Sequence, residues 1–266
     1  MNDVTAVVLT YNERENIKRT LDSITWIPRV LVIDSFSTDE TCAIASDFEN
    51  VEVVKRAFDT HATQWNFGLA NVSSEWAFSL DADYEVSEEL AVEIKNLNPS
   101  SETGGYSAQF EFRIFGRALR TSVYPPRTVL FRPARAKYID EGHTQMLQAT
   151  GRVEALRGRI IHDDRKPLRR WLASQSRYVE LEAQHLIEAD ARELSAADRL
   201  RKRVYYGAPV MFVYLLVGRG LILDGWPGWF YVCQRVVAEF LLSMRLLIDR
   251  EWSENAAQSA SGKAMQ

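Results

Sequence analysis

The chain has 266 residues, 46% of them hydrophobic and 26% charged, which is enough to bury a sizeable core in one large domain or in a domain with an appendage. Its net charge of −4 gives no overall basic field, so we expect no nucleic-acid partner. Cys42 and Cys233 are far apart and match no metal-ligand spacing, which predicts a reduced, cytoplasmic protein.

The first hundred residues alternate between short apolar runs and stretches with apolar residues at helical spacing. Four runs predict buried strands: residues 4–9, 30–33, 51–54 and 76–80. This alternation predicts a mostly parallel sheet with helices on both faces. Polar segments follow three of the strands, at 10–13, 34–39 and 81–83, and we expect them to meet at one edge of the sheet, where open α/β folds bind ligands.

Asp81 and Asp83 follow the fourth strand, one residue apart. Two carboxylates so close would repel each other, so a cation should lie beside them. Carboxylate and phosphate oxygens suit Mg²⁺ or Mn²⁺, which predicts a divalent metal that holds a diphosphate. Neither G-x-G-x-x-G nor a P-loop follows the first strand, which argues against a dinucleotide dehydrogenase and a P-loop kinase.

Taken together, the polar segments resemble family-2 inverting glycosyltransferases of the GT-A fold, in particular bacterial enzymes that act on lipopolysaccharide core and related envelope glycans. The resemblance covers roughly the first 100 residues and lies in three motifs: Thr-Tyr-Asn-Glu-Arg-Glu-Asn-Ile at 10–17, Val-Ile-Asp-Ser-Phe-Ser-Thr-Asp at 32–39 and Ser-Leu-Asp-Ala-Asp at 79–83. It implies a Rossmann-like α/β fold with a mixed sheet. It also implies a nucleotide-diphosphate-sugar donor, which in the resembled family is usually a UDP-sugar.

The resemblance also implies a role for each polar segment in donor binding. Tyr11 could instead pack in the core, and Asn12 could cap the following helix. For Asp39 we favour a role at the start of the next helix. The implied donor-binding residues are, for the base pocket, Thr10, Tyr11, Asn12 and Glu13; for the nucleoside, Asp34; and for the ribose, metal and diphosphate, Asp81, Ala82 and Asp83.

A second polar cluster, Asp140-Glu141-Gly142-His143, lies in the second half of the chain. An inverting transferase needs a base that accepts the proton of the acceptor hydroxyl, and a carboxylate within hydrogen-bond reach suffices. Many members of the resembled family carry Glu-Asp here, whereas this chain has Asp-Glu. We expect Glu141 to be the base, with Asp140 as second candidate and His143 as its partner or a diphosphate ligand. The alternative is a polar turn around Gly142.

His162 ends a short apolar run at 159–161, and the resemblance implies that it approaches the metal. The alternative is a turn histidine that helps to cap the next helix. Lys166 and Arg170 could contact a phosphate of donor or acceptor. Arg127 and Arg132 flank an expected strand at 128–131, where they could face phosphates or be solvated edge charges.

Further strands are expected at 106–112 and 119–124, and helices at 86–97 and 168–192. From 208 to 248 the chain is apolar but interrupted by charges and glycines. With basic residues before it and tryptophans at its turn, this hairpin is typical of an interfacial segment on the cytoplasmic leaflet. The alternative is a helical subdomain or an oligomer contact. We expect no secretory signal. The sequence has no uninterrupted run of about 20 apolar residues, so we also expect no simple membrane span.

These observations predict a catalytic domain at 1–165, with a nucleotide half at 1–100 and an acceptor half at 104–165. A helical extension at 166–253 and a disordered tail at 254–266 complete the chain. The expected activity is inverting hexosyl transfer to an envelope glycolipid or polysaccharide precursor, by a peripheral protein at the inner face of the plasma membrane. Two alternatives are a sugar transferase to polyprenyl phosphate and a non-catalytic scaffold that binds nucleotide sugar or membrane.

Overall fold

The structure is a computed structural model that describes residues 3–141, 144–190, 192 and 194–264. It divides into two compact units, Met1–Lys166 and Pro167–Gln266, and each is described here by itself.

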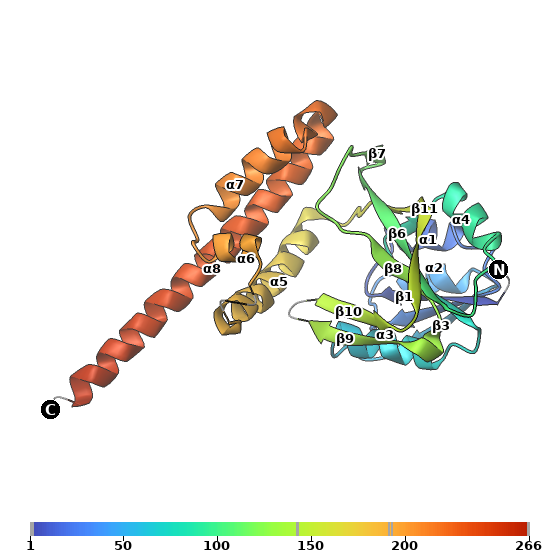
Figure 1. The fold of residues 1–266 in the computed structure, drawn as a ribbon, viewed down its shortest axis with the longest axis horizontal. Helices are drawn as coiled ribbons and strands as arrows, with labels where there is room; N and C mark the ends of the chain where they lie inside the picture. Colours follow the sequence, from blue (N-terminus) through green and yellow to red (C-terminus); the bar gives the residue numbers. More distant parts are fainter. Residues whose placement is uncertain (1–2, 142–143, 191, 193, 265–266) are drawn as a thin grey trace. The chain divides into compact units, whose positions relative to one another are not determined.

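The first unit begins with four parallel strands that alternate with helices (Figure 1). The first, second and fourth of these strands are buried runs rich in β-branched and aromatic residues, which suits a sheet covered on both faces, whereas the third lies at the sheet edge and is only partly buried. Strand β1 lies between β2 and β4, and β2 pairs with β3. The elements are β1 (Val4–Thr10), α1 (Ile17–Asp22), β2 (Arg29–Asp34), α2 (Thr41–Ser46), β3 (Val51–Lys55), α3 (His61–Ala70) and β4 (Trp76–Asp81).

The sheet continues past β4 in the order β3-β2-β1-β4-β8-β6-β11-β5. Strand β8 is antiparallel to both of its neighbours, while β11 is parallel to β6, so the sheet is mixed, as expected. Strands β9 and β10 form a separate antiparallel pair, and β7 pairs with β6. The elements are β5 (Tyr84–Val86), α4 (Glu88–Lys95), β6 (Thr103–Ile114), β7 (Arg117–Ala118), β8 (Arg127–Phe131), a 3₁₀ turn (Pro133–Arg135), β9 (Ala136–Glu141), β10 (Thr144–Ala149) and β11 (Arg152–His162).

Helices cover both faces of this sheet, as the sequence predicts. On one face, α1, α2 and α4 pack on a core that includes Trp76, Phe78 and Leu80. On the other face, α3 packs through Trp65 against Ala77 and the β9 residue Tyr138. Strand β4 is therefore buried on both sides, which fixes the position of the residues that follow it.

Three expected elements differ from the structure. Residues 119–124 form no strand, and Pro125 and Pro126, which lack the N–H groups that a ladder needs, separate them from β8. The helix expected at 86–97 begins at Glu88, since Ser87 caps it and residues 84–86 pair with β11. The helix expected to reach Arg192 ends at Glu188.

The second unit is helical. Its helices enclose a small core that includes Leu186, Leu242 and Leu246. No helix in the described part of the chain is long and apolar enough to cross a membrane. The elements are α5 (Leu168–Glu188), α6 (Ala196–Arg201), α7 (Gly207–Val213), a π-helical turn (Tyr214–Gly218), a 3₁₀ turn (Leu221–Asp224) and α8 (Trp226–Ala264).

Helix α8 reaches Ala264, where the sequence analysis expected a disordered tail from residue 254. The tail is small and polar, but it holds several alanines and no proline, and alanine has the highest helix propensity of any residue. Helix formation can therefore continue past the last turn that packs on the core.

Candidate donor-binding site

The three polar segments that follow β1, β2 and β4 meet at one edge of the sheet, as predicted. In the parallel register, Thr10 pairs with Asp34, and Leu9 pairs with Asp81. Because β1 lies in the middle, its polar segment is flanked by the other two.

Asp34 anchors the β2 side of this edge. Its carboxylate is fully buried and accepts hydrogen bonds from the backbone N–H and the hydroxyl of Ser37, at 2.9 Å for the N–H. The Ser37 hydroxyl in turn accepts the N–H of Asn12 at 2.7 Å. These bonds fasten the loop after β2 to the loop after β1 and give the edge a fixed shape.

Asn12 does not cap the following helix. Its φ is 55°, and its side-chain oxygen accepts the Thr38 N–H at 2.7 Å, so it joins the two loops instead. Helix α1 has Asn16 as its N-cap residue. Tyr11 is 52% exposed, so it does not pack in the core. Asp39 accepts the Thr41 N–H at 3.0 Å at the start of α2, which is the role favoured for it.

The two aspartates after β4 face different partners. Asp81 accepts a hydrogen bond from Tyr84 and lies near Arg127, whereas Asp83 faces His162 and Lys166. Burial and the neighbouring Asp83 carboxylate raise the pKa of Asp81. Burial would also raise the pKa of Asp83, but the charges of Lys166 and His162 outweigh it and hold that pKa well below its usual range.

Lys166 is the cation at the centre of this site. Its Nζ lies 3.0 Å from Glu13 Oε1, 3.1 Å from Asp83 Oδ2 and 3.4 Å from Asp164 Oδ1. Burial disfavours its charge, yet the carboxylates raise its pKa well above the ordinary value. Burial raises the pKa of Glu13 to about 7, against the attraction of Lys166.

His162 lies at the end of β11, with its Nε2 3.4 Å from Asp83 Oδ2. Burial lowers its pKa, but the Asp83 carboxylate more than compensates, so the pKa is raised overall. Its Nδ1 is buried and has no hydrogen-bond partner in the described part of the structure. The side chain is thus held inside the site and is not a surface turn residue.

Asn16 braces the site, and sequence reasoning missed it. Its amide donates to Glu13 at 3.0 Å and to Asp164 at 3.2 Å, and its oxygen accepts the N–H of Arg165 at 3.2 Å. The available signal was its place within the first motif, three residues after Glu13; its complete burial is seen only in the structure.

A cavity of about 230 Å³ adjoins Asp81. Arg127 enters it from β8 with its guanidinium 4.5 Å above the Tyr124 ring. Arg132 instead lies 4.5 Å above Trp76 and pairs with Glu75. The two arginines therefore have different roles, and Arg127 is the one that a phosphate or sugar could reach. The lining residues include Trp65, Ser79, Asp81, Tyr84, Phe110, Arg127, Tyr138 and Gln145.

Asp140 lies at the start of α3. Its carboxylate accepts the Thr60 hydroxyl at 2.9 Å and the Ala62 N–H at 3.3 Å, so it satisfies donors at that helix end. The side chain of Glu141 and all of His143 lie outside the described residues, so the structure does not place them.

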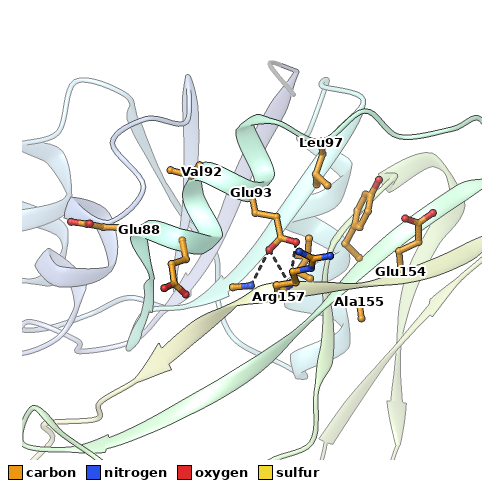
Figure 2. A pocket seen from close by; sticks show the side chains of 11 residues that line it. Glu88, Val92, Glu93, Leu97, Glu154, Ala155 and Arg157 are labelled. Carbon is orange, nitrogen blue, oxygen red and sulfur yellow. Dashed lines mark hydrogen bonds between the residues drawn. The ribbon is translucent and has the colours of Figure 1, made fainter.

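A second, larger hollow of about 850 Å³ lies between α4 and β11 (Figure 2). There the Glu93 carboxylate accepts the backbone N–H groups of Arg157 and Gly158, each at 2.9 Å (Figure 2). No residue predicted for donor binding or catalysis lines it, and Glu93 is occupied in holding α4 to β11.

The residues present fit a divalent metal. Asp83 and His162 supply a carboxylate and an imidazole side by side, which suits Mn²⁺ or Mg²⁺. Within the described residues, no three His, Cys, Asp or Glu side chains form a cluster that could hold a metal. A metal held by two side chains would take its remaining ligands from phosphates and water, as is usual at phosphate-transfer sites.

Comparison with known proteins bears on this arrangement. Residues 5–123 match the family model described as glycosyl transferase family 2. This stretch, a little under half of the chain, is similar to the domain of that family. An uncharacterized glycosyltransferase of Rickettsia felis is 32% identical to this chain over 109 residues, which is 41% of this chain and 38% of that relative. The chain thus matches well under half of that relative's length.

A lipopolysaccharide core biosynthesis glycosyltransferase, LpsC of Rhizobium meliloti, is 21% identical to this chain over 252 residues, covering 91% of each chain. Among solved structures, the mannosyltransferase PcManGT of Pyrobaculum calidifontis, in complex with GDP-Man and Mn²⁺, aligns with a TM-score of 0.55 at 17% identity. The alignment covers 93% of this chain and 87% of that one. The fold is therefore the GT-A fold that the three motifs predict, and the resemblance stated from the sequence is confirmed.

Proposed function

We propose that the protein is an inverting glycosyltransferase that moves a sugar from a nucleotide-diphosphate sugar, UDP-linked by expectation, to a hydroxyl of an envelope glycolipid or polysaccharide precursor. The observation that carries this proposal is one continuous edge, in a domain similar to that of family 2, with Asp34 at one end and Asp83, His162 and Lys166 at the other. Its length-wide likeness to LpsC supports an envelope acceptor.

One group of residues at this edge would bind the nucleoside of the donor, and another would bind its diphosphate. The buried Asp34 and the loop fastened by Asn12 would hold the nucleoside, with the exposed Tyr11 beside the base. Asp83 and His162 would hold a divalent metal. When bound, that metal neutralises the negative charge of the departing diphosphate. Asp81, beside the cavity that Arg127 enters, would face the ribose or the transferred sugar.

The base must act from the acceptor side. We propose Glu141, at the end of β9, as the residue that takes the proton from the acceptor hydroxyl. Asp140 is the weaker candidate, because its carboxylate already accepts hydrogen bonds from Thr60 and Ala62. His143 stays a proposed partner or diphosphate ligand.

We further propose that the second unit binds the inner membrane leaflet, where a lipid-linked acceptor would lie. The support is a set of large apolar side chains left exposed in two places. Tyr205 and Tyr206 directly precede α7, and the others lie at and around the turn between α7 and α8: Val213, Val217, Leu223, Trp226 and Trp229. Arg203 is exposed nearby, whereas Arg201 pairs with Glu239 at 2.8 Å and belongs to the interior of the unit. The basic contribution to membrane binding is thus smaller than the sequence suggested.

Asp83→Asn tests the proposed activity. We measure the rate at which nucleoside diphosphate is released from donor sugars in the presence of Mn²⁺ and a bacterial membrane extract. This rate should be at least about 100-fold lower in the variant, because it lacks one of the charges that hold the metal and the diphosphate. Asp22→Asn, an exposed aspartate paired with Lys18 on α1, is the matched control and should retain full activity. Full turnover in Asp83→Asn, or no nucleotide release by the unmodified protein from any donor, would contradict the proposal.

A further inference from the structure

Lys166 lies where the carboxylates of Glu13, Asp83 and Asp164 converge. It is 16% exposed, and its ammonium lies within 3.4 Å of Glu13, Asp83 and Asp164. The backbone around it is fixed: the Lys166 N–H donates to Asp164 at 3.1 Å, and the Arg165 N–H donates to Asn16. The structure therefore holds a cation in place among three carboxylates.

One carboxylate oxygen is shared between this cation and the metal site. Asp83 Oδ2 lies 3.1 Å from Lys166 Nζ and 3.4 Å from His162 Nε2. A divalent metal held by Asp83 and His162 would approach the same oxygen that the ammonium contacts. Two cations at so short a distance repel each other strongly, and burial weakens the screening by water. The metal and the ammonium therefore compete for Asp83 Oδ2, and a phosphate between them would lower their repulsion.

We propose that Lys166 is a built-in cation of the donor site: it occupies the Asp83 oxygen until the metal arrives, and it then binds the donor's diphosphate. This inference depends on the proposed function, since it assigns a further ligand to the same site. Glu13 and Asp164 keep the ammonium beside the site when Asp83 passes to the metal. A lysine ammonium has three donors and binds phosphate as a compact charge.

This exchange predicts opposite effects of removing the lysine charge. Without the ammonium, the metal meets no competitor at Asp83 and should bind more tightly in the absence of nucleotide. The diphosphate, in contrast, loses a charged ligand and should bind more weakly when no metal is present. A lysine that merely stabilises the fold would not shift these two affinities in opposite directions.

The test is calorimetric titration of the full chain with Mn²⁺ alone, and with UDP and GDP in the presence of a chelator. In Lys166→Met, we expect Mn²⁺ to bind at least about fivefold more tightly. The better of the two nucleotides should bind about tenfold more weakly, as for the loss of one charge-assisted hydrogen bond. Lys166→Arg, which keeps the charge, should move both affinities less than Lys166→Met does. Lys18→Met, at an exposed lysine paired with Asp22, is the matched control and should change neither.

Unchanged or weaker Mn²⁺ binding in Lys166→Met overturns the inference, as does unchanged binding of nucleotide without metal. If that variant does not fold, Lys166→Gln takes its place, because glutamine removes the charge but keeps polar atoms among the carboxylates. A titration with Mn²⁺ and nucleotide together separates the two proposals. If the unmodified protein binds neither UDP nor GDP even then, both fail; if it binds one and Lys166→Met shows no exchange, only the role of Lys166 fails.

Discussion

Glu13 lies in the loop after β1, next to Lys166. It is 8% exposed, and its carboxylate contacts Lys166 and the amide of Asn16. Burial raises its pKa to about 7, so the fold favours the protonated acid more than the unfolded chain does. Ionisation of Glu13 near neutral pH therefore acts against the fold.

The stability of the protein should depend on this group in a defined direction. A raised pKa in the folded state gives a contribution that is full below the ordinary pKa of glutamate and is lost as the pH rises through about 7. In Glu13→Gln the group is neutral at every pH. The melting temperature of the unmodified protein minus that of Glu13→Gln should therefore fall between about pH 5 and about pH 8. A difference that stays flat or rises over this range would show that Lys166 keeps Glu13 ionised in the fold.

Some residues of the site could be placed from the sequence and others could not. Asp34, Asp81 and Asp83 follow buried strands directly, so a parallel sheet puts them at one edge. Lys166 contacts Asp83 across 83 positions of the chain, and no local pattern encodes that distance. Asp140 likewise accepts a hydrogen bond at the start of α3 from Ala62, which lies 78 positions earlier in the chain.

At the scale of elements, β9 is fastened to α3 by side chains. Asn66 on α3 donates to the Tyr138 carbonyl at 2.8 Å and accepts the Tyr138 N–H at 2.9 Å. The Tyr138 ring stacks on Trp65 at 5.3 Å, and its hydroxyl donates to Ser79 at 3.0 Å. Because β9 leads to Glu141, these contacts set where the acceptor side of the site begins.

Replacing Asn66 should weaken this attachment. Asn66→Ala removes both hydrogen bonds and leaves two backbone groups of β9 unpaired, so we expect the free energy of unfolding to fall by about 2 kcal/mol in urea titrations. Asn96→Ala is the matched control, because Asn96 ends α4 and its side-chain amide donates to the Val92 carbonyl at an exposed position. Its cost should stay within roughly 0.5 kcal/mol. Equal costs for the two variants would mean that the Asn66 bonds do not hold β9.

The elements of the nucleotide half were predictable because strand and helix periods alternate cleanly there. The acceptor half was harder, since its strands pair out of chain order and β6 and β11 are distant partners. Strands β9 and β10 were missed because each has only two adjacent large apolar residues, Tyr138-Ile139 and Met146-Leu147, on a pair that stands apart from the main sheet. The absent strand at 119–124 shows the opposite error, since a strand was expected in a segment that is a loop ending at two prolines.

At the scale of the whole molecule, the exposed apolar side chains of the second unit should decide membrane binding. Val217 and Leu223 are 67% and 70% exposed. The double variant Val217→Glu, Leu223→Glu should reduce sedimentation with vesicles of anionic phospholipid by about tenfold, because it replaces apolar contacts with charges that the surface repels. Val92→Glu, at a 57% exposed site on α4, is the matched control and should bind as the unmodified protein does. Unaltered vesicle binding in the double variant, together with a change in its oligomeric state, would assign this surface to a protein contact.

The measurement that tests the central claim most directly is thermal unfolding with a panel of nucleoside diphosphates, with and without Mn²⁺. Binding at a saturating excess of about 100 times the dissociation constant adds roughly 2.7 kcal/mol to stability, which a melting curve resolves readily. We predict that one nucleotide raises the melting temperature in a manner that depends on Mn²⁺, and that Asp83→Asn loses this rise while melting cooperatively. If no nucleotide stabilises the unmodified protein, with Mn²⁺ and with lipid vesicles present, the edge formed by Asp34, Asp83 and His162 is not a donor site and the account is contradicted.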